Sequence, residues 1–385
     1  MTQEITLRTG LARALLATQG YTPEVEEALR RAAELFEGRD VPQLFPVLRS
    51  LASFYNYTGE HEKSAHVGRE IVRLANQEHD TSMLVDGYFL LGANVGFLGD
   101  LHAGLEHLDK AIASFRSGPY RTHPFRLGGN PGVASLTTSA FFLWTLGYPD
   151  SAVQRAQQAV ALANELEHPF TLAYALYHAG FLHLWRRESD IVAEHAVEVL
   201  KVAEDHDFQI WRALGNVLLG VAKTGLGQAD EGLAQLQEGV NLYRGLKTPP
   251  VFWPLLLMLY AGAQGQAGRP ADGLDLLDEA FKATENSSGI ALVPEFLLLK
   301  GELLLALPRG PRESPELWFR QALDIATDLD AKMLQLRAAV RLCRLRQDDH
   351  RQRENNKLLR SIYDTFTEGF TTADLTEARD LLDDR

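Results

Sequence analysis

A repeat of about forty residues constrains the fold of this chain more than any other feature of its sequence. Small residues recur inside apolar segments at Ala52, Gly92, Ala140, Gly180, Gly220, Ala261, Gly301 and Ala339. The spacings between them are 40, 48, 40, 40, 41, 40 and 38 residues. A fixed period of this length is the signature of repeat architectures, in which each unit packs mainly on its neighbours.

Each repeat has the pattern of two helices joined by a tight turn. A turn residue stands seven positions after each of the first six small residues: Gly59, Gly99, Gly147, Arg187, Gly227 and Gly268. Glycine adopts the left-handed conformation that ends a helix at little cost, and small residues let paired helices approach closely. Acidic residues such as Asp150 and Asp190 follow, where they suit helix caps and the positive end of a helix dipole. No alternating β-branched stretch competes, so the sequence predicts an all-α solenoid.

The repeat array is predicted to span residues 1–370. Its 48-residue spacing requires an irregular insertion, which we place at 117–132 because this stretch is rich in Gly and Pro. Arg121 and Arg126 make it a candidate anion-binding or partner-docking loop, since two guanidinium groups can hold a carboxylate or phosphate. The alternative is a longer surface connection whose arginines pair with nearby acidic helices.

The tail, residues 371–385, is predicted to form a C-terminal capping helix. Its apolar residues Leu375, Ala378, Leu381 and Leu382 can pack on the preceding repeat. A solenoid needs such a cover because its last hairpin otherwise exposes an apolar face. The alternative is a helix that binds a partner.

Four segments resemble the tetratricopeptide repeat family. They are FLGDLHAGLEHLDKAI (97–112), LGYPDSAVQRAQQAV (146–160), LGQADEGLAQLQEGV (226–240) and AGRPADGLDLLDEAF (267–281). The resemblance implies a right-handed superhelix, here of about eight to nine hairpins. The usual unit of the family is 34 residues, so we expect helices longer by about one turn in some repeats. The motif is informative about fold and says little about function.

A second resemblance is to the carboxy-terminal helical half of bacterial signalling proteins that combine a nucleotide cyclase with an AAA-type or STAND-type ATPase. It rests on ALLATQGYTPEVEEAL (14–29), GNPGVASLTTSAFFLWTLGYPDSAV (129–153), LKGELLLAL (299–307), FRQALDIA (319–326) and IYDTFTEGFTTADLTEARDLLDD (362–384). This resemblance implies a sensor that signals to an ATPase or cyclase effector. The chain has no G-x-x-x-x-G-K-[ST] loop, so nucleotide hydrolysis is not assigned to it. We expect either the sensor half of a larger protein or a free-standing relative.

Composition excludes several classes of function. The chain has 38 Lys and Arg against 51 Asp and Glu, a net charge of −13, which argues against a nucleic-acid partner. Its single cysteine, Cys343, allows no internal disulfide and is expected in the core. The sequence contains no secretory signal pattern and no apolar stretch of about 20 residues, so we expect no membrane association and a cytoplasmic location.

The sequence contains no recognisable catalytic motif. It has no G-x-S-x-G elbow, and nothing around Cys343 resembles a cysteine–histidine site. The pairs His61–His66, His102–His107 and His178–His183 are each five residues apart, so on a helix their side chains diverge instead of sharing one face. We therefore predict no catalytic residue, no metal site and no cofactor.

The inner, concave face of the solenoid is the predicted binding surface. By the resemblance, the first helix of each hairpin lines this face, close to its small packing residue. This predicts contacts from Arg49, Ser53, Asn56, Asp86, Thr137, Phe141, Tyr174, Tyr177, His178 and Phe181, with Phe89, Trp144, Trp211, Thr224 and Gln264 as further candidates. Aromatic and amide groups of this kind can hold a peptide by stacking and hydrogen bonding. The alternative is that the aromatic residues pack between repeats.

Tyr174 and His178 are the favoured pair, because residues four apart project from one helix face. The cationic clamp that some family members use for acidic peptide tails is not evident, since Arg49, Arg212 and Lys300 are scattered over several repeats. The functional hypothesis is a non-catalytic scaffold or sensor for a protein, peptide or small signal, which changes superhelical pitch on binding. A self-association module is the alternative, and an enzyme is the third hypothesis.

Overall fold

The computed structural model describes residues 2–35, 41–117, 130–247, 250–285, 287, 289–308, 310, 313–345 and 349–383. No strand occurs within these ranges, and the helices found there are α1 (Thr2–Gln19), α2 (Pro23–Glu34), α3 (Val41–Thr58), α4 (His61–Glu78), α5 (Thr81–Phe97), α6 (Leu101–Ser117), α7 (Pro131–Thr145), α8 (Pro149–Glu165), α9 (Pro169–Trp185), α10 (Ser189–Asp205), α11 (Gln209–Gly225), α12 (Ala229–Gly245), the short 3-10 helix η2 (Pro250–Phe252), α13 (Trp253–Gln266), α14 (Pro270–Thr284), α15 (Val293–Leu305), α16 (Pro315–Asp328), α17 (Lys332–Arg344), α18 (Asp349–Tyr363) and α19 (Ala373–Asp383).

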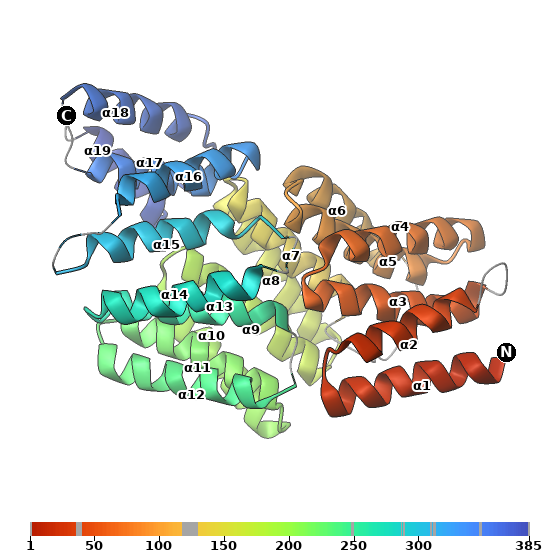
Figure 1. The fold of residues 1–385 in the computed structure, drawn as a ribbon. Coiled ribbons are helices and arrows are strands. Elements are labelled where there is room, and N and C mark those ends of the chain that lie inside the picture. Colours follow the sequence, from red (N-terminus) through yellow and green to blue (C-terminus); the bar gives the residue numbers. More distant parts are fainter. Residues whose placement is uncertain are drawn as a thin grey trace.

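Within these described ranges, consecutive helices pair into nine hairpins, from α1–α2 to α17–α18, and each hairpin packs on the next. The array coils into a superhelix with its two ends on opposite sides of the molecule (Figure 1). The predicted all-α solenoid of helical hairpins with a C-terminal capping helix is therefore confirmed. The helices α8 to α12 are each 17 residues long, which accounts for a period nearer forty than 34.

The small residues of the repeat lie where the two helices of a hairpin cross. A Cβ atom on Gly92 would lie 2.8 Å from the carbonyl oxygen of Gly104, and one on Gly220 would lie 2.7 Å from that of Gly232. In the α3–α4 hairpin, the Ser64 hydroxyl donates to the carbonyl of Ala52 over 2.8 Å. As the sequence predicts, small side chains at these positions permit the close approach of the paired helices.

The turn between the helices of a hairpin uses the left-handed conformation. Gly147 has φ 94°, and Arg187 occupies the equivalent place with φ 65°. For a residue with a Cβ atom this conformation costs about 1 kcal/mol. Asp150 and Asp190 follow within the first turn of the second helix, where their negative charges interact favourably with the positive end of the helix dipole. Neither residue is the N-cap.

Successive superhelical turns lie directly on one another. The Ser287 hydroxyl approaches the carbonyl of Gly59 over 3.4 Å, across 228 residues. The amide of Ile290 donates to the carbonyl of Phe97 at the end of α5 over 2.9 Å. Six hairpins, α3–α4 to α13–α14, therefore complete one superhelical turn. This arrangement brings the ends of early first helices against the C-terminal third of the chain.

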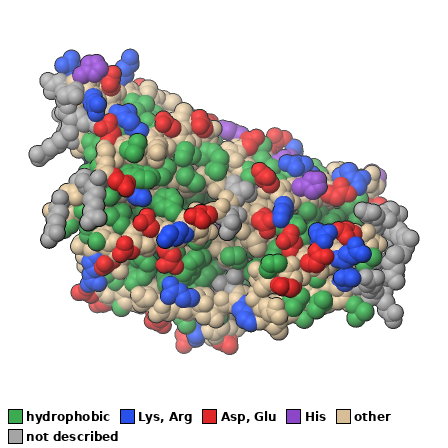
Figure 2. Space-filling model, viewed as in Figure 1, with side chains coloured by type: hydrophobic (Ala, Val, Ile, Leu, Met, Phe, Trp, Pro, Cys, Tyr) green, Lys and Arg blue, Asp and Glu red, His purple; other side chains and the backbone are tan. Residues whose placement is uncertain are grey.

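The surface in Figure 2 carries Lys and Arg interspersed with Asp and Glu, so on this face the acidic balance is not gathered into one area. None of the helices in the described ranges is long and apolar enough to span a membrane.

Candidate binding surface

The predicted contact residues come from the first helices of four successive hairpins, α3, α5, α7 and α9. Ser53 and Asn56 are partly exposed on α3, and Tyr174 and His178 are partly exposed on α9. We call the partly exposed residues of this set the inner surface: Arg49, Ser53, Asn56, Phe141, Tyr174 and His178. These residues lie on α3, α7 and α9.

Arg49 and Asp86 form an ion pair between α3 and α5. The Arg49 Nε donates to Asp86 Oδ1 over 2.7 Å, and Asp86 is buried while Arg49 is partly exposed. Arg49, Ser53 and Asn56 are spaced by four and three residues, so they follow one another along a single face of α3. The charge of Arg49 is thus balanced within the protein, while the polar face of α3 continues along the helix.

Tyr174 and His178 lie together on α9. Their ring centroids are 4.1 Å apart, and the imidazole Nδ1 of His178 lies 2.8 Å from the carbonyl oxygen of Tyr174. Burial lowers the pKa of His178 to about 4, so this imidazole is neutral at pH 7. A carbonyl oxygen only accepts, so Nδ1 carries the proton and Nε2 acts as an acceptor.

Tyr174 of α9 also contacts α7, the first helix of the preceding hairpin. Burial raises the pKa of the Tyr174 phenol, the hydrogen bond with Thr137 lowers it, and the Tyr57 phenol of α3 makes a smaller raising contribution. Thr137 of α7 completes this contact region, with its hydroxyl 3.4 Å from that of Tyr174. Three hairpins lead from α3 to α9, about half of a six-hairpin superhelical turn, so the two helices belong to opposite sides of the superhelix.

Other predicted residues are buried beneath this surface. Tyr177 is 1% exposed and Phe181 is 7% exposed, and Thr137 and Trp144 are also buried. Trp211, Thr224 and Gln264 are buried as well, whereas Phe89 is partly exposed. These buried side chains form the packing between hairpins on which the inner surface rests.

Trp185 joins several of the aromatic residues into one stack. Its ring lies 4.4 Å from that of Phe141, 4.6 Å from that of Phe181 and 5.0 Å from that of Trp144. Trp185 is the last residue of α9, and the repeat alignment did not select it. Its position five residues after the small residue Gly180 was the available signal.

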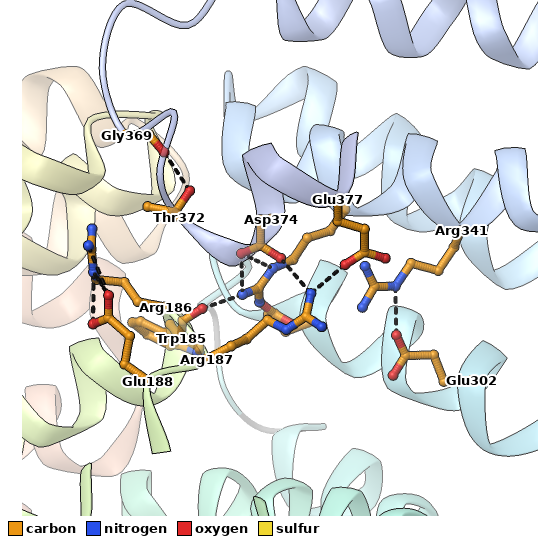
Figure 3. A network of polar contacts seen from close by, with 12 residues as sticks. Trp185, Arg186, Arg187, Glu188, Glu302, Arg341, Gly369, Thr372, Asp374 and Glu377 are labelled. Carbon is orange, nitrogen blue, oxygen red and sulfur yellow. Dashed lines mark hydrogen bonds and ion pairs between the residues drawn. The ribbon is translucent and has the colours of Figure 1, made fainter. Parts of the chain in front are cut away.

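Arg337 of α17 is a further residue that the repeat pattern did not point to. Its side chain is 8% exposed and bonds to Asp374 of α19, to Glu295 of α15 and to the carbonyl of Trp185. Figure 3 shows the surroundings of Asp374 and the end of α9. The sequence signal for this network was a pair of arginines, Arg337 and Arg341, in the otherwise mainly apolar run MLQLRAAVRLC.

In the described part of the chain, the following cavities lie elsewhere. One of about 600 Å³ is bordered by α16, α17 and α18 and lined by residues including Asp324, Asp328 and Ile362. A smaller one of about 170 Å³ lies between α6, α7 and α8. Neither includes a residue of the inner surface. The loop candidates Arg121 and Arg126 lie outside the described residues, and within those residues no three His, Cys, Asp or Glu side chains gather as a metal site would require.

Comparison with solved structures finds the same kind of solenoid. A Rap protein complexed with Competence and Sporulation Factor aligns with a TM-score of 0.58 and 11% identity, covering 100% of this chain and 98% of that one. The apo form of the quorum sensor NprR from B. thuringiensis aligns with a TM-score of 0.50 and 10% identity, covering 94% and 97%. A tetratricopeptide repeat protein from Parabacteroides merdae aligns with a TM-score of 0.38 and 14% identity, covering 93% and 99%.

No protein-family model matches the sequence, and no curated protein matches it significantly. The structural similarity shows a shared fold, a tetratricopeptide-like array of helical hairpins. The resemblance to cyclase–ATPase signalling proteins stays a prediction from sequence.

Proposed function

We propose that the chain is a non-catalytic scaffold or sensor that binds a peptide or an extended protein segment on its inner surface. The observation that carries this proposal is that α3, α7 and α9, first helices of hairpins spread over half a superhelical turn, each present partly exposed polar or aromatic groups. Asn56 and Ser53 lie on α3, Phe141 on α7, and Tyr174 and His178 on α9. A segment that reaches both α3 and α9 would be held from two sides.

The chemistry of these groups suits a polypeptide main chain. Asn56 supplies both amide donors and an acceptor, and the Nε2 of neutral His178 supplies a further acceptor. The rings of Tyr174 and Phe141 supply flat apolar area for side chains. Because Arg49 is paired with Asp86, the surface presents little net positive charge, and a strongly acidic tail is not the favoured ligand.

The solved Rap structure supports the same use of the fold, since that protein is complexed with Competence and Sporulation Factor. For this chain the ligand is proposed on the grounds of its own residues. A small signal that stacks on the Tyr174 and His178 rings would use the same surface.

The experiment is selection from a displayed library of random peptides, followed by affinity measurement on purified chain. The double variant Tyr174→Ala/His178→Ala should lose tenfold or more in affinity, because stacking and an acceptor are removed together. The matched control is Glu194→Ala/Glu198→Ala, an exposed pair on the second helix of the same hairpin. Equal affinity of both folded double variants and the natural chain would exclude Tyr174 and His178 from the site.

The proposal also includes a relay, in which binding on the inner surface is signalled to an ATPase or cyclase effector in the cytoplasm. It is supported by the second sequence resemblance alone. The mass of the native polypeptide on a denaturing blot of source cells tests it, since a band well above 42.8 kDa indicates an attached effector. A band at 42.8 kDa would instead require a separate partner.

Self-association is the second candidate function. Leu7 and Leu11 on α1 are 70% and 50% exposed and lie one helical turn apart at one end of the array. Light scattering should show a mass that rises with concentration if these residues join two copies. The substitution of both by Ser should then abolish the rise, and a constant monomer mass would reject this candidate.

A further inference from the structure

The C-terminal helix α19 is bound to a part of the chain that lies far earlier in sequence. Asp374, in its first turn, accepts from Arg337 Nη2 over 2.9 Å and from Arg337 Nε over 3.2 Å. Glu377, one turn later, pairs with Arg187 in the α9–α10 turn and with Arg344 of α17 over 2.8 Å. Figure 3 shows Asp374 and Glu377 directed toward Arg187 and the end of α9.

Arg337 transmits this contact to the aromatic stack. Its guanidinium lies 4.7 Å from the ring centroid of Trp144 and donates to the carbonyl of Trp185. A third bond, over 2.5 Å, goes to Glu295 of α15. One buried side chain thereby contacts α7, α9, α15 and α19 together.

The aromatic stack leads in turn to the inner surface. Trp144 and Trp185 are nearly parallel, with 15° between their planes. Trp185 stacks on Phe141 of the inner surface at 4.4 Å. A displacement of the end of α9 would therefore move a side chain that we assign to ligand binding.

We expect the ion pairs and hydrogen bonds of Arg337 to form or break together. The side chains of Arg337 and Asp374 are 8% and 4% exposed, so water reaches neither charge while α19 is docked. A buried charge without its partner is strongly unfavourable, and intermediate arrangements are therefore poorly populated. The partners come from elements that meet only through tertiary packing, so loss of α19 from its place breaks contacts on α9 and α17 together.

We propose that α19 is a latch that regulates the inner surface: docked, it fixes the end of α9 and the Trp185–Phe141 stack, and released, it allows the walls of the superhelix to separate. This inference rests on the proposed function of the inner surface. A partner that engages the acidic side of α19 would compete with Arg337 and Arg187, and so would control access to the ligand site.

The test is hydrogen exchange of the full chain, measured by mass spectrometry for the natural sequence, Asp374→Asn and Asp380→Asn. Asp380 lies on the same helix with a side chain 63% exposed, and it serves as the matched control. In Asp374→Asn we expect exchange about tenfold faster or more in 373–383, 181–188 and 141–146 together, with α11 unchanged. Asp380→Asn should match the natural chain. Faster exchange confined to 373–383 would overturn the coupling.

Access to the inner surface has its own readout, the rate at which diethyl pyrocarbonate modifies His178. We expect this rate to rise at least threefold in Asp374→Asn, while the exposed His350 reacts equally in both proteins. An unchanged His178 rate would overturn the regulatory role even if exchange increases. Neither readout uses a ligand, so failure of the latch is distinguishable from failure of peptide binding.

A milder variant covers the case in which Asp374→Asn opens the whole chain. Arg187→Gln removes the exposed partner of Glu377, which also lies 3.6 Å from Asp374 Oδ1, and leaves the Arg337–Asp374 pair in place. It should give a smaller increase in the same three segments. A uniform increase across all hairpins in Arg187→Gln would overturn the proposal.

Discussion

The Nε2 atom of His102 lies 2.9 Å from Oδ2 of Asp330, although 228 residues separate them. The same separation recurs between Gly59 and Ser287. Both contacts join the first superhelical turn to the hairpins that lie over it. The solenoid is thus held by contacts between superhelical turns as well as by contacts between neighbouring hairpins, which makes its pitch a quantity that point substitutions can change.

Gly59 offers a direct test of these contacts. It has φ 81°, and a Cβ atom there would lie 2.9 Å from the Ser287 hydroxyl. Gly227 has φ 83° with nothing within 4 Å of its Cβ position. Both Ala variants should lose about 1 kcal/mol from backbone strain, and Gly59→Ala should lose more because it also meets the next superhelical turn. Urea unfolding midpoints measure the difference, and equal losses would contradict it.

The substitution of glycine by alanine should change the free energy of unfolding in opposite directions at two helical positions, Gly220 and Gly262, because only Gly220 lies at a close helix crossing. In Gly220→Ala the new methyl would lie 2.7 Å from the carbonyl of Gly232, which should destabilise the chain by about 1–3 kcal/mol. In Gly262→Ala the nearest atom is 3.7 Å away, so the better helix propensity of Ala should stabilise by up to about 1 kcal/mol. Thermal unfolding of both variants checks the signs. A stabilised Gly220→Ala chain would refute the close crossing.

The repeat, the hairpins and the close crossings could be predicted from sequence because they are local. The size of a side chain at Gly92 or Gly220 decides how near two adjacent helices can lie, and the period decides how often this recurs. For the same reason the proximity of Tyr174 and His178 follows from their spacing of four residues. The prediction of a TPR-like solenoid needed no long-range information.

Contacts between superhelical turns could not be predicted in this way. They depend on the small rotation between hairpins summed over six of them, and no single repeat encodes that sum. The hydrogen bond from Arg337 to the carbonyl of Trp185, 152 residues away, likewise joins hairpins that are not neighbours. How deeply Tyr177 and Phe181 are buried also depends on the neighbouring hairpin, which sequence spacing does not specify.

His195 should make stability dependent on pH. Burial lowers its pKa to about 4, with a smaller contribution from the charge of His183. The ordinary pKa of 6.5 applies in the unfolded chain, so below pH 6.5 the unfolded state binds a proton that the folded state refuses. Stability therefore falls as the pH is lowered from 6.5 toward 4, by at most about 1.4 kcal/mol per pH unit for this group.

The variant His195→Gln stays neutral and should show a shallower loss between pH 6.5 and 4. His350→Gln, which replaces an exposed histidine, is the control and should follow the natural chain. Urea unfolding at several pH values measures the slopes. Parallel slopes for all three proteins would mean that His195 does not contribute.

A double-mutant cycle tests the energetic coupling of Arg337 and Asp374. Asp374 has a lowered pKa: burial alone would raise it, and the Arg337 guanidinium outweighs that effect. Arg337→Met leaves the buried Asp374 without its main partner and should cost about 3–5 kcal/mol at pH 7. Asp374→Asn in the Met background should then cost little, because the charge it removes is no longer compensated. Chemical unfolding of the four proteins gives a coupling energy, expected at about 1–3 kcal/mol. Strict additivity would show that the two side chains contribute independently and that the bond between them does not hold α19 in place.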